Sequence, residues 1–77
     1  MVFGEVVRRH RSARGLSQEQ LAEAADLHRN HVGFVERGER VPSIDIARQI
    51  AEALCLPLSA LVAEAERQWD RSRSARS

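Results

Sequence analysis

The stretch Gly15–Arg40 reads GLSQEQLAEAADLHRNHVGFVERGER, and it decides the fold. Ser17 stands three residues before Gln20, which is the pattern of a capping box and predicts that a helix begins here. Asp26 interrupts the helical pattern, because aspartate favours turns. A second helical pattern follows over residues 28–37. The stretch therefore predicts two short helices joined by a tight turn.

The two helices carry the side chains that close packing across such a turn requires. Ala22 is small where the helices must cross, and Leu27 places an apolar side chain directly after the turn. Val32 and Val35 lie three residues apart, so both can face the core from one side of the second helix. Two helices joined by three or four residues are the local signature of a DNA-reading pair. The remaining side chains of the second helix project outward: Arg29, Asn30, Gly33, Phe34 and Arg37.

Helical spacing of apolar residues continues along the rest of the chain, and no stretch keeps the alternation of a strand for long. A first helix is predicted over residues 2–14 and ends at Gly15, a fourth begins at Ser43, and a fifth begins near Pro57. The side chains expected to face inward from these three helices are Phe3, Val6, Val7, His10, Ile44, Ala47, Ile50, Ala51, Leu54, Leu61, Val62, Ala65 and Trp69. We therefore predict one all-α domain of five helices over residues 1–69.

Charge is unevenly distributed along this chain of 77 residues, whose net charge is only +1. Residues 1–14 carry four arginines against one glutamate, whereas residues 17–26 carry three acids and no base. All 12 basic residues are arginine, which suits phosphate and guanine, although a GC-rich coding sequence would enrich arginine as well. Residues 70–77, DRSRSARS, are almost free of apolar side chains and are expected to form a disordered tail.

Other function classes find no support in the sequence. No apolar run approaches the roughly 20 residues that span a bilayer, and the N-terminal stretch lacks the layout of a signal peptide. Cys55, the single cysteine, cannot form an internal disulfide and is expected to be a partly buried thiol. His28 and His31 have possible metal-ligand spacing, but no further ligand clusters with them. We therefore predict a cytoplasmic protein with no metal, cofactor, small-molecule ligand or enzymatic activity.

Three segments, taken in order, resemble the Cro and phage-repressor type of helix-turn-helix, also called the xenobiotic-response-element family. They are GLSQEQLAEAADL at 15–27, VERGERVPS at 35–43 and AEALCLPLSAL at 51–61. Several matched segments in the right order are more specific than one short motif. Within the family, LHRNHVGFVERGER at 27–40 looks most like the controller proteins of restriction–modification systems. The resemblance implies a lambda-repressor-like fold and a role in transcription regulation.

Double-stranded DNA is the partner that the resemblance implies. Gln18 matches a family residue that contacts the DNA backbone or supports a base-reading side chain. Arg29 and Asn30 match the first outward positions of the recognition helix, where arginine can bridge guanine O6 and N7 and asparagine can bridge adenine N6 and N7. The full set of expected DNA-contacting residues is Gln18, His28, Arg29, Asn30, Gly33, Phe34, Arg37, Arg40 and Ser43.

Four of these residues are assigned less specific contacts. Arg37, Arg40 and Ser43 match places that approach the DNA backbone. Phe34 matches a base-facing position, and since a phenyl ring cannot read hydrogen bonds it would contact a thymine methyl group or a sugar. The alternative is that Phe34 packs within the protein or belongs to a protein interface.

Other matched positions concern the fold. Arg11 and Glu36 match a charge pair that ties the first helix to the third in many relatives. Asp26 and Cys55 stand where the family often has glycine, so both are expected to adopt left-handed backbone angles, with mild strain at Cys55. Gly33 costs roughly 1 kcal/mol relative to alanine inside a helix. Close approach to DNA is one explanation for that glycine.

A homodimer is expected because one recognition helix reads only a few base pairs. The residues suspected of forming its interface are Leu56, Leu58, Val62 and Trp69, although the same residues could instead complete the core of a monomer. Two alternative functions remain open at this point. An antitoxin would need a partner-binding segment, for which only the tail is spare. A protein-interaction module with weak DNA binding would use the outward-facing Phe34.

Overall fold

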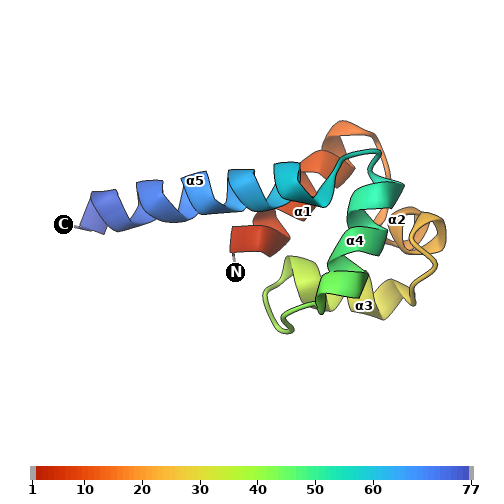
Figure 1. Ribbon diagram of the computed structural model, residues 1–77. Coiled ribbons are helices and arrows are strands. Elements are labelled where there is room, and N and C mark those ends of the chain that lie inside the picture. Colours follow the sequence, from red (N-terminus) through yellow and green to blue (C-terminus); the bar gives the residue numbers. More distant parts are fainter. Residues whose placement is uncertain (1, 77) are drawn as a thin grey trace.

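Helices account for most of the chain in the computed structural model, which describes the backbone of residues 2–76 and the side chains of residues 2–71. They are α1 (Val2–Ala13), α2 (Gln18–Ala24), α3 (Arg29–Glu36), α4 (Ile44–Ala53) and α5 (Leu58–Arg76). The described residues contain no strand, so the predicted all-α fold of five helices is confirmed. The first four helices gather into a head, and α5 packs along α1 and then extends past it as a straight rod (Figure 1).

Hydrogen bonds from short polar side chains mark the helix starts. The Ser17 hydroxyl accepts from the backbone N–H of Gln20 at 3.0 Å, and the Gln20 side chain accepts from the Ser17 N–H at 2.8 Å, which confirms the capping box. Ser43 caps α4 in the same way, by accepting from the N–H of Ile46 at 3.2 Å. His28 lies just outside α3 instead of inside it: its Nδ1 accepts from the N–H of Asn30 at 3.2 Å.

Left-handed residues close the helices where the sequence predicted breaks. Gly15 has a φ of +69° after α1, and Asp26 has a φ of +58° in the turn between α2 and α3. Cys55 has a φ of +59° after α4, as expected from its place in the glycine position. Its side chain is exposed, however, so the expectation of a partly buried thiol is wrong. A side chain from α4 braces the turn between α2 and α3, because Gln49 Nε2 donates to the carbonyl of Ala25 at 3.0 Å.

The core lies where all five helices meet in the head. Its fully buried large side chains are Val6, Val7, Leu21, Val32, Val35, Ile50, Leu54 and Leu61. Burial of each such side chain contributes about 1.5–3 kcal/mol. Gly4 brings α1 onto the backbone of α3: a Cβ at Gly4 would lie 2.2 Å from the carbonyl oxygen of Val35. This close approach fixes the position of α3 against the rest of the head.

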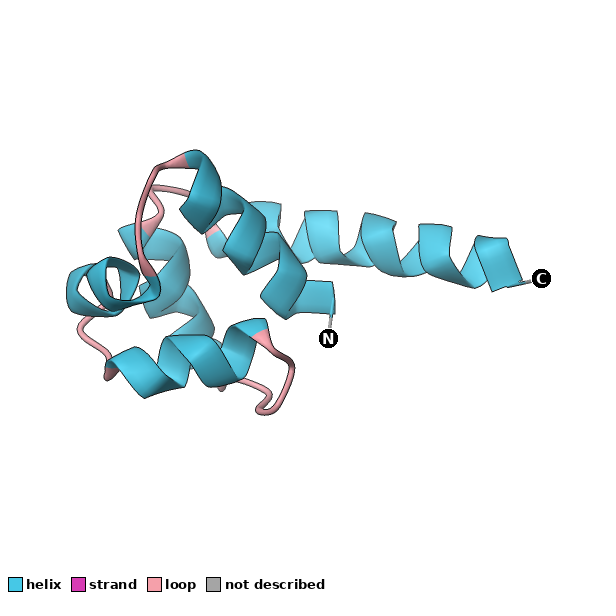
Figure 2. Cartoon of the chain, turned by 180° about the vertical axis from the view of Figure 1, so that it is seen from behind, coloured by secondary structure: helices cyan, strands magenta, loops and turns pink. Residues whose placement is uncertain are grey.

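Three side chains predicted to face inward face solvent instead. Ile44 is 69% exposed, since it begins α4 one turn before Ala47, the first buried residue of that helix. Val62 is 41% exposed on the side of α5 that turns away from Leu61. Trp69 is 55% exposed, although its neighbour Gln68 still contacts Glu5 of α1. Beyond the head, α5 continues without another helix beside it (Figure 2). Helical spacing thus predicted which side of each helix is apolar, but not which residues on that side are buried.

The end of α5 also differs from the sequence prediction. Residues 70–77 were expected to be a disordered tail, whereas α5 continues to Arg76, and Ser77 lies outside the described residues. Arginine and alanine are good helix formers, and extending an existing helix adds one hydrogen bond for each residue fixed. Low apolar content is therefore compatible with the continuation of a helix whose earlier turns pack against α1 and α4. Within the described residues no single helix is long and apolar enough to cross a membrane, and the one pair of helices that passes together, α4 with α5, is bent by 104°.

Candidate nucleic-acid interface

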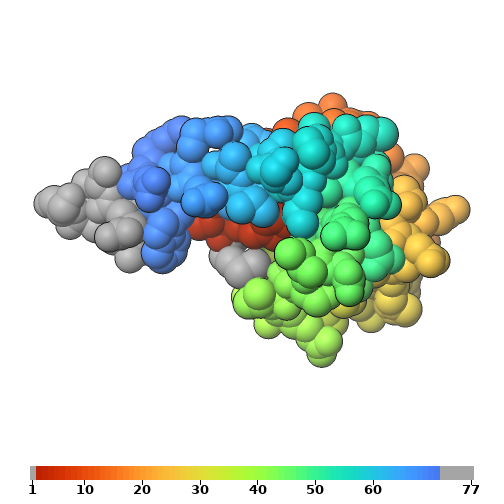
Figure 3. Space-filling view, viewed as in Figure 1, coloured from red at the N-terminus to blue at the C-terminus, as the bar shows by residue number. Residues whose placement is uncertain are grey.

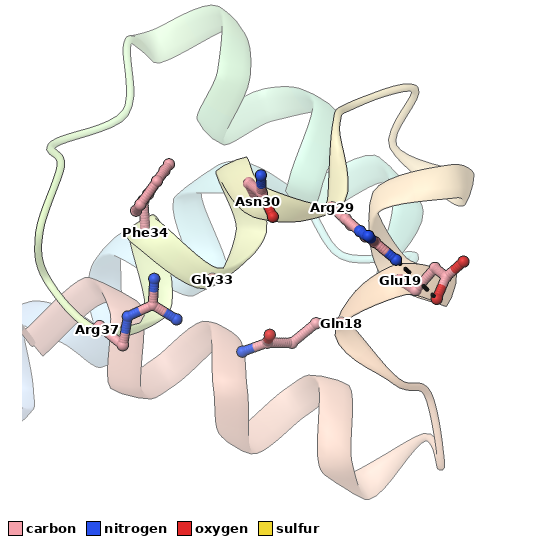
Figure 4. A pocket seen from close by; sticks show the side chains of 7 residues that line it. All are labelled: Gln18, Glu19, Arg29, Asn30, Gly33, Phe34 and Arg37. Atoms are coloured by element: carbon pink, nitrogen blue, oxygen red, sulfur yellow. Dashed lines mark ion pairs between the residues drawn. The ribbon is translucent and has the colours of Figure 1, made fainter.

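A polar groove lies between the start of α2 and the outward side of α3 (Figure 4). It is lined by Gln18, Glu19, Arg29, Asn30, Gly33, Phe34 and Arg37, and we refer to these residues as the polar groove. Six of the seven were predicted from the sequence as DNA-contacting residues. Val32 and Val35 are fully buried on the inner side of α3, and this burial leaves Arg29 and Asn30 exposed on the opposite side. The helix-turn-helix pattern therefore brings these predicted residues onto one surface.

Three of the predicted residues lie outside the polar groove. His28 caps α3 through its ring nitrogen. Ser43 caps α4 with its hydroxyl oxygen, which leaves the hydroxyl hydrogen free to donate elsewhere. Arg40 follows α3 and reaches back over the ring of Phe34, with 4.7 Å between the guanidinium carbon and the ring centroid.

A buried charge network holds α1, α2 and α3 together beneath the groove. Arg11 Nε donates to Glu36 Oε2 at 2.6 Å, and Arg11 Nη2 donates to Glu36 Oε1 at 3.1 Å. Gln18 Nε2 donates to the same Oε1 at 3.0 Å, while Arg11 Nη1 donates to the carbonyl of Leu16 at 2.7 Å. The Glu36 side chain is only 2% exposed, so the ion pair between Arg11 and Glu36 is a buried contact. This network positions the amide of Gln18 at one end of the groove.

Two charged residues add contacts that the sequence did not predict. Glu19 belongs to the groove and lies 4.0 Å from Arg29 Nη1, with both side chains largely exposed (Figure 4). Its position in the first turn of α2 was the available signal, because acids favour helix N-termini. Glu39 forms an ion pair with Arg37 Nε. The sequence offered no signal for this pair, since the two residues lie on either side of the bend at Gly38.

A second charge cluster joins α1 to α5 away from the groove. Glu64 Oε1 accepts from Arg9 Nη2 at 2.9 Å, and Glu64 Oε2 lies 2.5 Å from His10 Nε2. The hydrogen bond with His10 lowers the pKa of the Glu64 carboxyl below its usual value, and the hydrogen bond from Arg9 lowers it further by a smaller amount. Burial of the carboxyl acts in the opposite direction but does not outweigh them. The inward-facing side chain of His10 therefore makes a polar contact with Glu64 of α5. The residues described contain no group of three or more side chains placed to hold a metal ion.

A second groove is apolar and lies where the starts of α1, α4 and α5 meet (Figure 3). It is lined by Phe3, Val41, Pro42, Ile44, Ala47, Leu58 and Val62, which we call the apolar groove. Val41 is 81% exposed, more than any other large apolar side chain described. Leu58 and Val62 belong to the predicted dimer interface, whereas Leu56 packs against the core and Trp69 lies farther along α5.

Comparison with known proteins gives the class of this chain. A helix-turn-helix family profile matches residues 7–61, which is more than half of the sequence. The chain belongs to the helix-turn-helix family. Among its relatives is the control protein C.SmaI of Serratia marcescens, which is 45% identical over 53 residues that make up 69% of this chain and 63% of that protein.

Other controller proteins are similar to the chain in sequence and structure. The control protein C.BamHI of Bacillus amyloliquefaciens is 44% identical over 55 residues, 70% of this chain and 68% of that protein. The crystal structure of the restriction-modification controller protein C.AhdI from Aeromonas hydrophila matches with a TM-score of 0.76 at 43% identity, covering 78% of this chain and 91% of that one. The similarity to controller proteins that the sequence suggested is therefore confirmed.

Proposed function

We propose that this protein is a sequence-specific transcription regulator of the controller type, which binds DNA by placing α3 in the major groove. The observation that carries the proposal is the polar groove, where Arg29, Asn30 and Arg37 project from one face of a helix whose other face is buried. A helix that is pinned to the core from behind and polar in front fits the geometry of major-groove recognition. The controller proteins among the relatives support the same reading.

Each groove residue has a role that its chemistry suits. Arg29 can donate two hydrogen bonds to guanine, and Asn30 can pair with adenine through both its donor and its acceptor. Gln18 contributes from α2, with its amide held by Glu36. Arg40 and Ser43 follow α3 and lie where backbone phosphates would pass. Because DNA is the partner, the protein is expected to act in the cytoplasm, with no catalytic step of its own.

The second part of the proposal is that the protein binds a partly palindromic operator as a homodimer. One helix reads too few base pairs to select a genomic site, and two-fold pairing places two recognition helices about 34 Å apart. The apolar groove supports this, since Val41 and Ile44 are exposed there beside Leu58 and Val62. A second copy would cover these side chains. Occupation of the operator would then block or recruit polymerase, according to where the site lies.

Selection of bound fragments from a random DNA pool at near-physiological salt tests this function. Wild type is compared with Asn30→Ala and with Arg48→Lys, an exposed position on α4 outside the polar groove. We expect a two-fold symmetric motif from wild type and from Arg48→Lys, and a motif that is altered or lost with Asn30→Ala. Enrichment without a motif in all three proteins would overturn the proposal and favour a protein-interaction module with only backbone attraction to DNA.

A further inference from the structure

Arg37 holds its guanidinium group against α3 and does not extend it toward the edge of the head. The side chain lines the polar groove together with Asn30 and Gln18, and Figure 4 shows it beside Gly33 and Phe34, at the end of α3 opposite Arg29. The family resemblance implies that Arg37 approaches the DNA backbone. The contacts around it indicate a different role, one that rests on the proposed DNA-binding function.

Gly33 creates the space that the guanidinium group occupies. A Cβ at Gly33 would lie 2.9 Å from Arg37 Nη1 and 3.5 Å from both Cζ and Nη2, so the Arg37 side chain is its nearest neighbour across the helix surface. The glycine is therefore not required by the backbone, because its φ is that of an ordinary helix and only one movable side chain would be displaced. Helix stability alone would favour alanine here. The position of Arg37 accounts for the glycine.

Two further side chains complete the support of the guanidinium. The ring of Phe34 lies 5.5 Å from Arg37 Cζ, within the range of a cation–π contact. The Glu39 carboxylate pairs with Nε, on the edge of the guanidinium nearest to the chain. Within residues 2–71, Nη1 and Nη2 donate to no protein acceptor, and the side chain lines the groove, so both nitrogens remain available to an acceptor there.

We propose that Arg37 is a specificity-determining residue that reads a guanine base in the major groove, and that Gly33, Phe34 and Glu39 are its positioning residues. Two parallel N–H donors match the O6 and N7 acceptors of guanine. The carboxylate of Glu39 beside the guanidinium repels a phosphate, whereas a base edge carries no net charge. The arrangement therefore favours a base over the backbone as the target.

The same random-pool selection tests this proposal with three more variants: Arg37→Lys, Gly33→Ala and Glu39→Gln. Arg37→Lys keeps the charge but loses the planar fork, so we expect the preference for guanine to fall about tenfold or more at one position of each half-site while the other positions keep theirs. Gly33→Ala is expected to weaken the same preference while raising Tm by about 4 °C or more, because alanine favours the helix. Glu39→Gln is expected to weaken it less, since an amide oxygen can still accept from Nε.

The outcomes separate this proposal from the proposed function. A wild-type motif that Arg37→Lys reproduces at every position, with affinity reduced evenly, would make Arg37 a backbone contact and overturn the inference alone. A Gly33→Ala variant that gains stability and keeps the full motif would overturn the positioning role of Gly33. Absence of any motif from wild type would overturn the proposed function, and the inference with it. Arg48→Lys is the matched control for an arginine-to-lysine change outside the groove.

Discussion

The polar groove and the apolar groove are both open to solvent, but they differ in how their side chains are held. In the polar groove, Glu36 fixes Gln18 from below, while Gly33 and Phe34 fix Arg37. In the apolar groove, Val41 and Ile44 project into solvent with most of their surface uncovered. The first surface is arranged before any partner arrives, which lowers the entropy cost of binding. The apolar groove contributes favourable free energy only when a partner covers its side chains and removes them from water.

Removal of Glu36 should have the largest effect, because it breaks the support of the polar groove from within. Glu36→Ala leaves the mostly buried Arg11 without its partner, so we expect the free energy of unfolding to fall by about 3–5 kcal/mol. Urea denaturation followed by circular dichroism measures this. Glu66→Ala, at an exposed position on α5, should change the same quantity by no more than about 0.5 kcal/mol. Equal, small losses for the two variants would show that the network does not support the fold.

A polar substitution in the apolar groove should leave the fold intact and act on assembly. Ile44→Asn changes a side chain that is 69% exposed, so the monomer should keep its Tm within a few degrees. If a second copy covers this groove, the mass measured by sedimentation should shift to that of the monomer, and affinity for the operator should fall at least about tenfold. Ala24→Asn, at an exposed position on α2 outside the apolar groove, is the matched control. A dimer that survives Ile44→Asn would place the interface elsewhere.

Neutralising the acid in the polar groove should produce a smaller change with the opposite sign. Glu19→Gln removes a negative charge that would face phosphates, and its ion pair with Arg29 is exposed and weak at 4.0 Å. Affinity for DNA should therefore rise by about threefold at low salt, and the gain should shrink as salt is added. Titration of a labelled duplex at two salt concentrations measures both. Weaker binding would mean that Glu19 orients Arg29.

The smallest effect should come from the cluster that ties α5 to α1. The lowered pKa of Glu64 means that its ionised form stabilises the fold at neutral pH, and that this contribution is lost as the pH falls through the pKa of the folded state. Glu64→Gln should lower Tm by a few degrees at neutral pH, and the gap from wild type should close as the pH drops below about 4.3. Melting curves over that range test the sign. A gap that does not vary with pH would assign the loss to packing.

Local chemistry explains how much of this molecule could be predicted from its sequence. The capping box at Ser17 and the cap at Ser43 placed helix starts correctly, because these contacts involve residues only three apart. The exposure of Ile44 could not be predicted in this way, since helical spacing shows which face is apolar but not how far a neighbouring helix covers it.

Contacts that depend on how closely separate helices pack could not be predicted from the sequence either. The place of Gly4 against the carbonyl of Val35 follows from how closely α1 and α3 approach, which no single helix pattern encodes. The support of Arg37 by Phe34 and Glu39 depends on side-chain rotamers around the bend after α3. The Arg11–Glu36 pair, by contrast, was available from family resemblance, although composition and spacing alone did not indicate it.

The exposed thiol of Cys55 offers a site for attaching a label that reports on dimer formation. It is the only cysteine in the sequence, it lies in the bend between α4 and α5, and it lines neither groove. A spin label or fluorophore can therefore be attached at one defined point of the natural chain without mutagenesis. In a dimer two such labels would be present, and the distance between them, measured with and without an operator fragment, would report how the two heads are spaced on DNA.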